Sequence, residues 1–505
     1  MKRREPRICA ARAPPRGGRR SRPYDWHADL GTPCSSPGGR VARSSNSGPP
    51  FAPARGATLR ALTIGLLLTV SIAAFEALAI ATILPETVRE IGGLAWYGWA
   101  FTGFMLANLV GIPLAGEAAD RRGPALPFIV GVLAFSGGLA IAGFANSMEV
   151  LVAGRVLQGG GAAALSSVAY VAVARAYPAA EQPRMLALLS SAWVLPGLFG
   201  PALAAGVARQ AGWRFVFLGL APATLFAGAL ALRGLRGLGP APEQIDPQRR
   251  TSVRDAALLA FGVALTLLGS RNEQRLIAIG LALVGAATAL YALRRLLPPG
   301  TLRARAGLPA AIAVLALVNF AFFAVEAFLP LALTEVRSES MTWVAAALTA
   351  GTLAWTTGSW IQARAATRTS RQSLLGSGLL CLLAGTAGAT AILSPALPAA
   401  VSVFAWALAG LGIGIAYPTA TLAILEAAPA GREGEVSATM QIANALAIAL
   451  GTGLGGDLIA RVAHGGRSPA LGIGVVDLAG LAACALALLA VRGVSEPKRT
   501  HPPGN

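Results

Sequence analysis

Long apolar stretches recur along almost the whole chain, from about residue 58 to residue 491. Each stretch is close to the roughly 20 residues that an α-helix needs to cross the hydrocarbon core of a bilayer. Hydrophobic residues make up 54% of the 505 residues and charged residues only 13%, so a soluble fold could not cover its surface with polar groups. The composition therefore excludes a soluble enzyme and predicts an all-α polytopic membrane protein.

Fourteen apolar runs are bounded by charged or turn-forming residues. The predicted spans are 59–84, 95–116, 124–145, 149–174, 185–207, 214–235, 254–270, 275–297, 308–333, 342–363, 373–393, 398–425, 436–460 and 470–491. The first six end before a long basic segment and the last six begin near residue 308, so two spans have no counterpart in either half. The pattern therefore predicts two six-helix bundles with two extra linker helices between them.

Domain boundaries follow from this division. We expect a disordered basic tail at 1–57, a first bundle at 58–235, an inner loop with the two extra helices at 236–306, a second bundle at 307–491 and a short tail at 492–505.

The distribution of basic residues predicts the orientation. Outside residues 1–60, loops and span ends on one side carry 20 Lys and Arg residues, and those on the other side carry 8. Positive charge is enriched on the cytoplasmic side of membrane proteins. The even number of spans then places both termini in the cytoplasm, and the side rich in arginine is called the predicted inner side below.

The net charge of +19 does not indicate a nucleic-acid partner. Thirteen of the 42 basic residues lie in residues 1–60, and the rest are scattered through short loops. A segment so rich in Arg, Pro, Gly and Ser cannot bury enough apolar surface to fold. A lipid-binding arm, a transit peptide and an upstream start codon remain alternative explanations of this tail.

Residues 116–123 combine glycines, carboxylates and paired arginines in a predicted inner loop. Gly116 would let two helices approach closely, and Gly123 permits a tight turn into the third span. Asp120 beside Arg121 offers ion pairs that one conformation can make and another can break. These four residues are candidates for conformational gating, and an ordinary positively charged loop is the alternative.

The fourth span contains Arg155, followed by Gln158 and a run of glycines at 159–161. A guanidinium inside an apolar helix is costly and rarely lacks a partner or a wet cavity. Arg155 is therefore a candidate for proton coupling, and Gln158 for substrate binding. The alternative for Arg155 is a side chain that reaches back to the membrane interface.

The fifth span is dense in glycine and proline between residues 196 and 206. Such residues bend a helix and let a neighbour pack against its backbone. Gly200 and Pro201 are further candidates for conformational gating, with a generic packing face as the alternative.

Glu76 is the only ionisable residue between Leu62 and Pro85 in the first span. A carboxyl group in a cavity that opens to each side in turn can bind a proton in one state and release it in the other. Glu76 is the first candidate for proton coupling and also for substrate binding. The alternative is a structural partner for a polar neighbour.

Three further acidic residues fall within predicted spans. Glu326, four residues before Pro330, is a candidate for recognising a substrate cation or for a second proton site. Asp457 lies near a predicted outer end where water could reach it, and Asp477 lies in the last span. Neither of these two aspartates receives a role.

Other chemistries find no support. The three histidines are remote from cysteines and paired acids, and the glycine run lacks the Lys-Ser/Thr of a phosphate loop. We expect no catalytic residue, no metal site and no cofactor.

Together, the motifs resemble those of the major facilitator superfamily, in its fourteen-helix drug:proton antiporter branch. Residues 116–123 are similar to the family's loop signature G-x-x-x-D-R-x-G, and residues 155–162 to its fourth-helix signature R-x-x-Q-G-x-G-A. Residues 196–206 are similar to the fifth-helix signature of antiporters, and Glu76 stands at the acidic position of the drug-exporter first helix. The matching loop of the second half has Gln362 where the acid would be, which predicts weaker gating there.

The resemblance implies a monomer that works by alternating access, in which two bundles rock around a central site. It implies export of drugs or other amphipathic or cationic small molecules across the cell membrane, driven by the proton gradient. A dedicated exporter of one metabolite or antibiotic, or an importer, is the alternative within this fold. A membrane sensor or scaffold that does not transport is the alternative of another class.

Overall fold

The structure, a computed structural model, describes residues 56–178, 181–240, 247–269, 274–366, 368–428 and 433–494, and these ranges contain helices but no β-strand. The helices are α1 (Gly56–Ile91), η1 (Leu94–Trp96), α2 (Tyr97–Arg122), α3 (Ala125–Gly143), α4 (Met148–Ala176), α5 (Gln182–Ser191), α6 (Val194–Ala211), α7 (Arg214–Leu235), α8 (Pro247–Gly269), α9 (Arg275–Leu296), η2 (Thr301–Arg303), α10 (Leu308–Leu331), η3 (Ala332–Val336), α11 (Met341–Ala365), α12 (Arg371–Ala391), α13 (Ala400–Glu426), α14 (Glu433–His464) and α15 (Pro469–Val491).

The fourteen predicted spans each coincide with helix. The fifth is divided into α5 and α6, the second begins in η1 before α2, and the ninth runs from α10 into η3. Eleven of the described helices are long and apolar enough to cross a membrane. The predicted disorder of the first tail falls outside the described residues, except that α1 already begins at Gly56.

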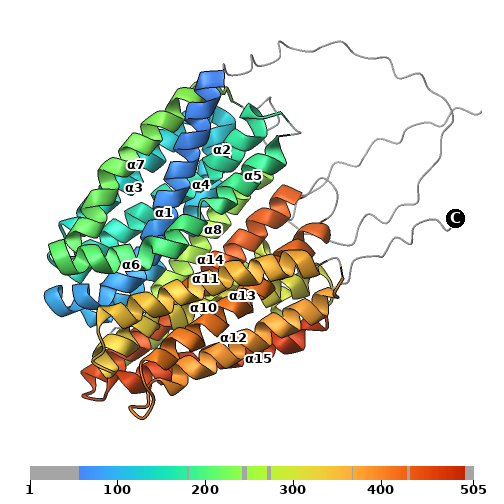
Figure 1. The fold of residues 1–505 in the computed structure, drawn as a ribbon. Coiled ribbons are helices and arrows are strands. Elements are labelled where there is room, and N and C mark those ends of the chain that lie inside the picture. The colour runs from blue at the N-terminus through green and yellow to red at the C-terminus, as the bar shows by residue number, and fades with distance from the viewer. Residues whose placement is uncertain are drawn as a thin grey trace, which may run out of the picture. The chain divides into compact units, whose positions relative to one another are not determined.

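Helices α1–α7 gather in one bundle and α10–α15 in a second (Figure 1). The same packing scheme occurs in both bundles. Helix α2 packs on α4 as α11 packs on α13, α3 on α4 as α12 on α13, and α1 on α7 as α10 on α15. This correspondence confirms the expected architecture of two six-helix bundles plus two linker helices.

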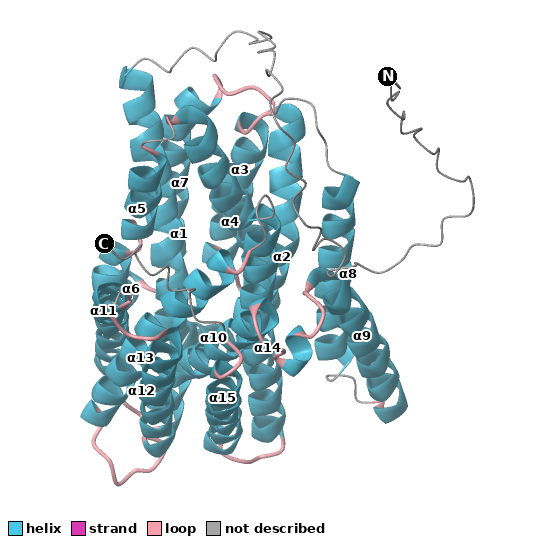
Figure 2. Cartoon of the chain, turned by 90° about the vertical axis from the view of Figure 1, so that its right-hand side faces the viewer, coloured by secondary structure: helices cyan, strands magenta, loops and turns pink. Residues whose placement is uncertain are grey.

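Two symmetric seams join the bundles: α2 packs on α14, and α6 packs on α11. The linker helices α8 and α9 pack mainly on each other, and α8 also contacts α2 and α14 (Figure 2). The pair therefore lies beside only one of the two seams.

Glycines bring the helices of the first bundle into backbone contact with α4. A Cβ added to Gly159 would overlap the Phe104 carbonyl of α2, and one on Gly161 would lie 2.5 Å from the Phe135 nitrogen of α3. The glycine run of the fourth span is therefore a packing surface, as the small side chains allow.

The division of the fifth span has a local cause. Pro196 has no N–H, so the carbonyl of Ala192 loses its partner in the next helical turn. The Ser71 hydroxyl of α1 donates to this carbonyl at 3.0 Å, which satisfies it across the helix interface. The break between α5 and α6 is thus stabilised by a residue of another helix.

Polar contacts close the predicted outer side between the bundles. Arg89 at the end of α1 forms an ion pair with Glu335 at 2.5 Å and donates to the Thr334 carbonyl at 2.7 Å. Arg209 at the end of α6 donates to the Thr342 hydroxyl at 3.2 Å. Both sets of contacts would have to break for the outer ends to separate.

A glycine seam joins α2 and α14 on the same predicted outer side. A Cβ added to Gly98 of α2 would overlap the Thr452 carbonyl of α14, and one on Gly456 would lie 2.6 Å from the Gly98 Cα. The Thr102 hydroxyl donates to the Ala449 carbonyl at 3.1 Å and lies 2.9 Å from the Thr452 hydroxyl. The outer halves of α2 and α14 are therefore in backbone contact.

The Ser71 bond can be tested by a double-mutant cycle. We expect Ser71→Ala to lower the free energy of unfolding by about 1 kcal/mol, the net contribution of one hydrogen bond. In a Pro196→Ala background the effect should shrink, because the new N–H can bond the Ala192 carbonyl. Thermal unfolding midpoints of the four proteins in one detergent measure this. An equal loss in both backgrounds would contradict the assignment.

The glycine seam should control which side is closed. Gly98→Ala adds a methyl group where α14 leaves no space, at a cost of about 1–3 kcal/mol, so the population with separated outer ends should rise roughly fivefold or more. Distances between spin labels at the exposed positions Asn146 and Ala396 report this separation. The control is Gly219→Ala, which meets nothing within 4 Å. An unchanged distance distribution in Gly98→Ala would refute the role of the seam.

Candidate functional site

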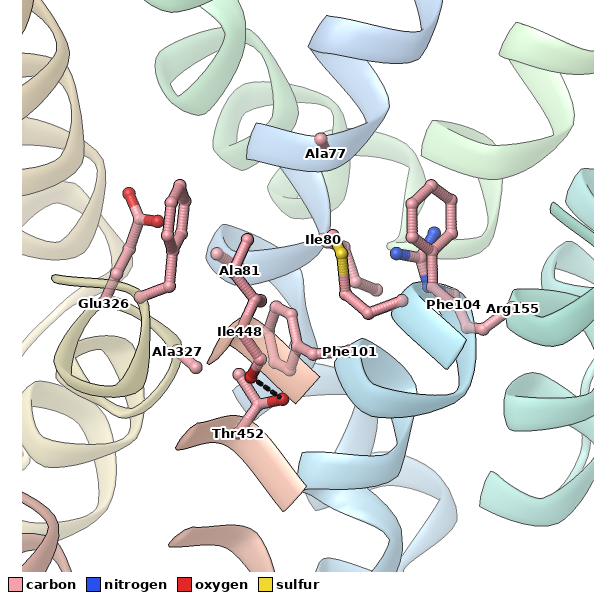
Figure 3. Close-up of a pocket in the computed structure, with 12 residues that line it drawn as sticks. Ala77, Ile80, Ala81, Phe101, Phe104, Arg155, Glu326, Ala327, Ile448 and Thr452 are labelled. Carbon is pink, nitrogen blue, oxygen red and sulfur yellow. Dashed lines mark hydrogen bonds between the residues drawn. The ribbon is translucent and has the colours of Figure 1, made fainter. Parts of the chain in front are cut away.

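A small cavity of about 60 Å³ lies where helices of the two bundles meet. Its wall comes from α1, α2, α4, α10 and α14, and most of the lining side chains are apolar or aromatic. The lining residues are Ala77, Ile80, Ala81, Phe101, Phe104, Met105, Arg155, Phe323, Glu326, Ala327, Ile448 and Thr452. Figure 3 shows Arg155 and Glu326 on opposite sides of this cavity, with Ile80, Ala81 and Phe101 between them.

The Arg155 side chain is 3% exposed and is held by several partners at once. One guanidinium nitrogen donates to both Glu76 and Gln158. Its Nε donates to the Ala100 carbonyl at 2.9 Å, and its charged carbon lies 4.4 Å from the centre of the Phe104 ring. A buried guanidinium needs such compensation, because an unpaired charge in a low-dielectric interior is strongly unfavourable.

Glu76 completes this ion pair from α1. Its side chain is 1% exposed, and its second carboxylate oxygen has no hydrogen-bond partner among the described residues. It does not line the cavity itself and acts on it through Arg155. The pair is electrically neutral as long as the carboxylate is ionised.

Glu326 enters the cavity from α10 in a different environment. It has neither an ion-pair partner nor a hydrogen-bond donor among the residues that the structure describes. Most side chains of the cavity wall around it are aromatic or aliphatic. An ionised carboxylate at such a site attracts a cation strongly, because no arginine of the described chain compensates its charge.

The predicted substrate-binding residue Gln158 lies elsewhere. Its side chain is fully buried, it accepts from Arg155, and it is not part of the cavity wall. The sequence did not point to Phe101, Phe104 or Phe323, which line the cavity. The only sequence signal was the three-residue spacing of Phe101 and Phe104, which places them on one face of a helix.

The residues of the loop motif take distinct positions. Asp120 forms an ion pair with Arg175 of α4 at 2.6 Å, and Arg121 pairs with Glu117 at 2.6 Å. Gly123 has φ +80°, and a Cβ there would lie 3.0 Å from the Leu238 carbonyl, which explains the need for glycine.

The second copy of this loop uses another ion pair. Gly358 packs against the backbone of α13, as the motif predicts, and Gln362 replaces the acid. Arg371 of α12 instead pairs with Glu426 at the end of α13. The second copy therefore makes a close helix contact through its glycine, and its charges connect different helices.

Two of the gating candidates, Gly116 and Gly200, make no unusually close contact with another helix in this conformation. Apart from its own helix, no atom of the described chain lies within 4 Å of a Cβ placed on Gly116, so the close helix approach expected there is not made in this conformation. A Cβ on Gly200 would make a normal contact at 3.6 Å with Phe75. Pro201 lies within α6, and the helix break occurs before it, at Ala192 and Trp193.

The two remaining acids lie outside the cavity. Asp457 is 3% exposed and paired with Arg461 one turn later, so the expected access of water to it is wrong. Asp477 is 2% exposed in α15 and lies near Thr390 of α12.

Comparison with known proteins gives a consistent picture. The family model described as "Major Facilitator Superfamily" matches residues 66–452. A probable multidrug-efflux transporter of Mycobacterium tuberculosis (strain H37Rv) is 27% identical over 409 residues, 76% of this chain and 84% of its own. The multidrug transporter protein MdtP of Bacillus subtilis is 26% identical over 176 residues, 35% of this chain, so the match spans only about a third (32%) of its length.

Solved structures agree in fold. A bacterial homologue of the human lysosomal transporter Spinster, solved in an inward-facing and unoccupied conformation, has a TM-score of 0.61 at 16% identity, covering 87% of this chain and 98% of its own. A peptide transporter of the POT family has a TM-score of 0.61 at 18% identity, covering 88% and 99%.

The buried ion pair predicts non-additive effects on stability. We expect Arg155→Met to destabilise the protein by about 3–5 kcal/mol, because Glu76 is left charged and unpaired in the interior. Adding Glu76→Gln should restore much of this loss. Unfolding midpoints of the single and double variants provide the measurement. If the two losses simply add, the residues do not compensate each other.

Proposed function

The chain belongs to the Major Facilitator Superfamily, and we propose that it is a proton-coupled antiporter that exports amphipathic organic cations by alternating access. It is a multi-pass membrane transporter rather than an enzyme. We further propose that it works as a monomer in the cell membrane, with both termini in the cytoplasm. The arginine-rich loops on one side support this orientation of the termini.

One observation carries the proposal: a single cavity joins a neutral ion pair to an uncompensated carboxylate. With Glu76, Arg155 and Glu326 all ionised, the formal charges of the three groups sum to −1. One proton or one monovalent cation brings this sum to zero. Since charges interact strongly in an apolar interior, the second of these ligands is disfavoured once the first has bound. Mutual exclusion of this kind is the requirement for antiport.

The two carboxylates would have different roles in the cycle. Glu326 would face the positive group of the substrate, while the aromatic side chains of the wall contact its apolar part. Protonation of Glu76 would remove the partner of Arg155 and leave a positive charge beside the cavity. This charge would repel the substrate cation and promote its release on the outer side.

The gating residues would couple the binding of proton and cation to the change between the two conformations. The outer contacts of Arg89 and the glycine seam close the outer side, which is the state expected to load from the cytoplasm. We propose that the Asp120–Arg175 pair, Arg121 and Gly123 stabilise the inner end of the first bundle in one state. Gly116, Gly200 and Pro201 would permit the approach of helices in the other.

Proton flux in proteoliposomes tests the proposal. A fluorescent monovalent organic cation should release protons from liposomes loaded with wild-type protein, and Glu326→Gln and Glu76→Gln should each reduce this release at least tenfold. Asp477→Asn, which neutralises a buried carboxyl outside the cavity, is the matched control and should keep the flux.

Exchange of one proton for one monovalent cation moves no net charge. We therefore expect the flux to respond to a pH gradient and not to a membrane potential imposed by potassium and valinomycin. Strong dependence on the potential would contradict the charge balance. Normal flux in Glu326→Gln would assign coupling elsewhere, and activity with one compound only in a broad panel would favour a dedicated exporter.

A further inference from the structure

A second charged surface lies far from the transport cavity, at the predicted inner end of the linker helices. The segment between α9 and α10 makes a tight turn, with Gly300 at φ +93° and Ala304 at φ +45°. Thr301 points inward, 6% exposed, and its hydroxyl donates to the Pro298 carbonyl at 2.7 Å. The turn therefore projects the next two side chains, Leu302 and Arg303, away from the protein.

The end of α15 lies directly beside this turn. The Gly307 N–H donates to the Gly493 carbonyl at 2.8 Å, and a Cβ on Gly493 would lie 3.3 Å from the Ala304 carbonyl. Gln372 of α12 donates to the Arg492 carbonyl at 3.4 Å and so fixes the end of α15. Segments almost 200 residues apart in the sequence thus form one surface.

Three exposed arginines occupy this surface: Arg303, Arg305 and Arg492. None of them has an ion-pair partner in the described part of the chain. The carboxylates of this region whose side chains are described are already engaged, since Asp255 pairs with Arg295 at 2.9 Å and Glu426 pairs with Arg371. The described carboxylates therefore leave the positive charge of this surface uncompensated.

An exposed leucine completes the arrangement. Leu302 is 60% exposed and directly precedes Arg303. Apolar side chains beside arginines at a membrane surface place the apolar group among acyl chains and the guanidinium at the phosphates. Arginine also binds phosphate oxygens with two parallel hydrogen bonds, which an isolated point charge cannot do.

We propose that Leu302, Arg303, Arg305 and Arg492 form a binding site for the headgroup of an anionic phospholipid in the inner leaflet. The lipid phosphate would neutralise the arginines, and its acyl chain would cover Leu302. Since the site joins the start of α10 to the end of α15, a bound lipid would hold the linker segment on the second bundle. The site requires no transport activity, so its test is independent of the proposed function.

The experiment compares lipid retention by the full chain in detergent. Phosphatidylglycerol and phosphatidylcholine are titrated separately, with bound lipid counted by native mass spectrometry and thermal unfolding measured in parallel. We expect wild-type protein to retain phosphatidylglycerol selectively and to unfold at a higher temperature with it. Arg303→Gln, Arg305→Gln and Arg492→Gln combined should weaken retention about tenfold or more and abolish the shift, because each basic residue near a surface adds to the attraction for anionic lipid.

Two controls distinguish a specific lipid-binding site from general electrostatic attraction between anionic lipid and the basic inner side. The combined Arg60→Gln, Arg233→Gln and Arg236→Gln variant removes three exposed arginines from the inner end of the first bundle and should retain the lipid. Arg303→Lys, Arg305→Lys and Arg492→Lys combined should keep part of the retention that the glutamine variant loses. Equal loss in both glutamine variants, or the same stabilisation by inorganic phosphate alone, would overturn the proposal.

Discussion

The charge of Arg155 inside an apolar helix is the constraint on which the centre of this structure depends. A guanidinium at this depth must be neutralised, and Glu76 of α1, Gln158 and the Ala100 carbonyl of α2 supply what it needs. Three helices of the first bundle are thereby held in one register around a buried charge. The position of the cavity wall, including Phe104 above the guanidinium, follows from that arrangement.

Much of the fold could be predicted because the bilayer imposes a length on every apolar run. The fourteen spans and the two unmatched linker helices follow from that rule and from the positions of charged residues. The sequence could not predict where the fifth span is divided, because the position of the break depends on the Ser71 hydroxyl of another helix as well as on Pro196. A single sequence contains no record of such pairing.

The sequence identified the charged residues near the cavity, because an ionisable residue in an apolar span is conspicuous. It did not reveal which of these residues form ion pairs with one another. Glu76 and Glu326 looked alike in the sequence. Only packing distinguishes the carboxylate held by Arg155 from the one that has no partner among the described residues. The aromatic wall was missed for a similar reason, since phenylalanine occurs on lipid-facing and cavity-facing surfaces alike.

The linker hairpin makes the two flanks of the transporter unequal. Helix α8 covers the seam between α2 and α14, whereas the described chain places no further helix over the seam between α6 and α11. A hydrophobic compound dissolved in the membrane therefore finds one flank shielded and the other bordered only by lipid. A compound that enters laterally from the bilayer would therefore do so through one flank in preference to the other. The near-symmetry of the two bundles alone would not provide this preference.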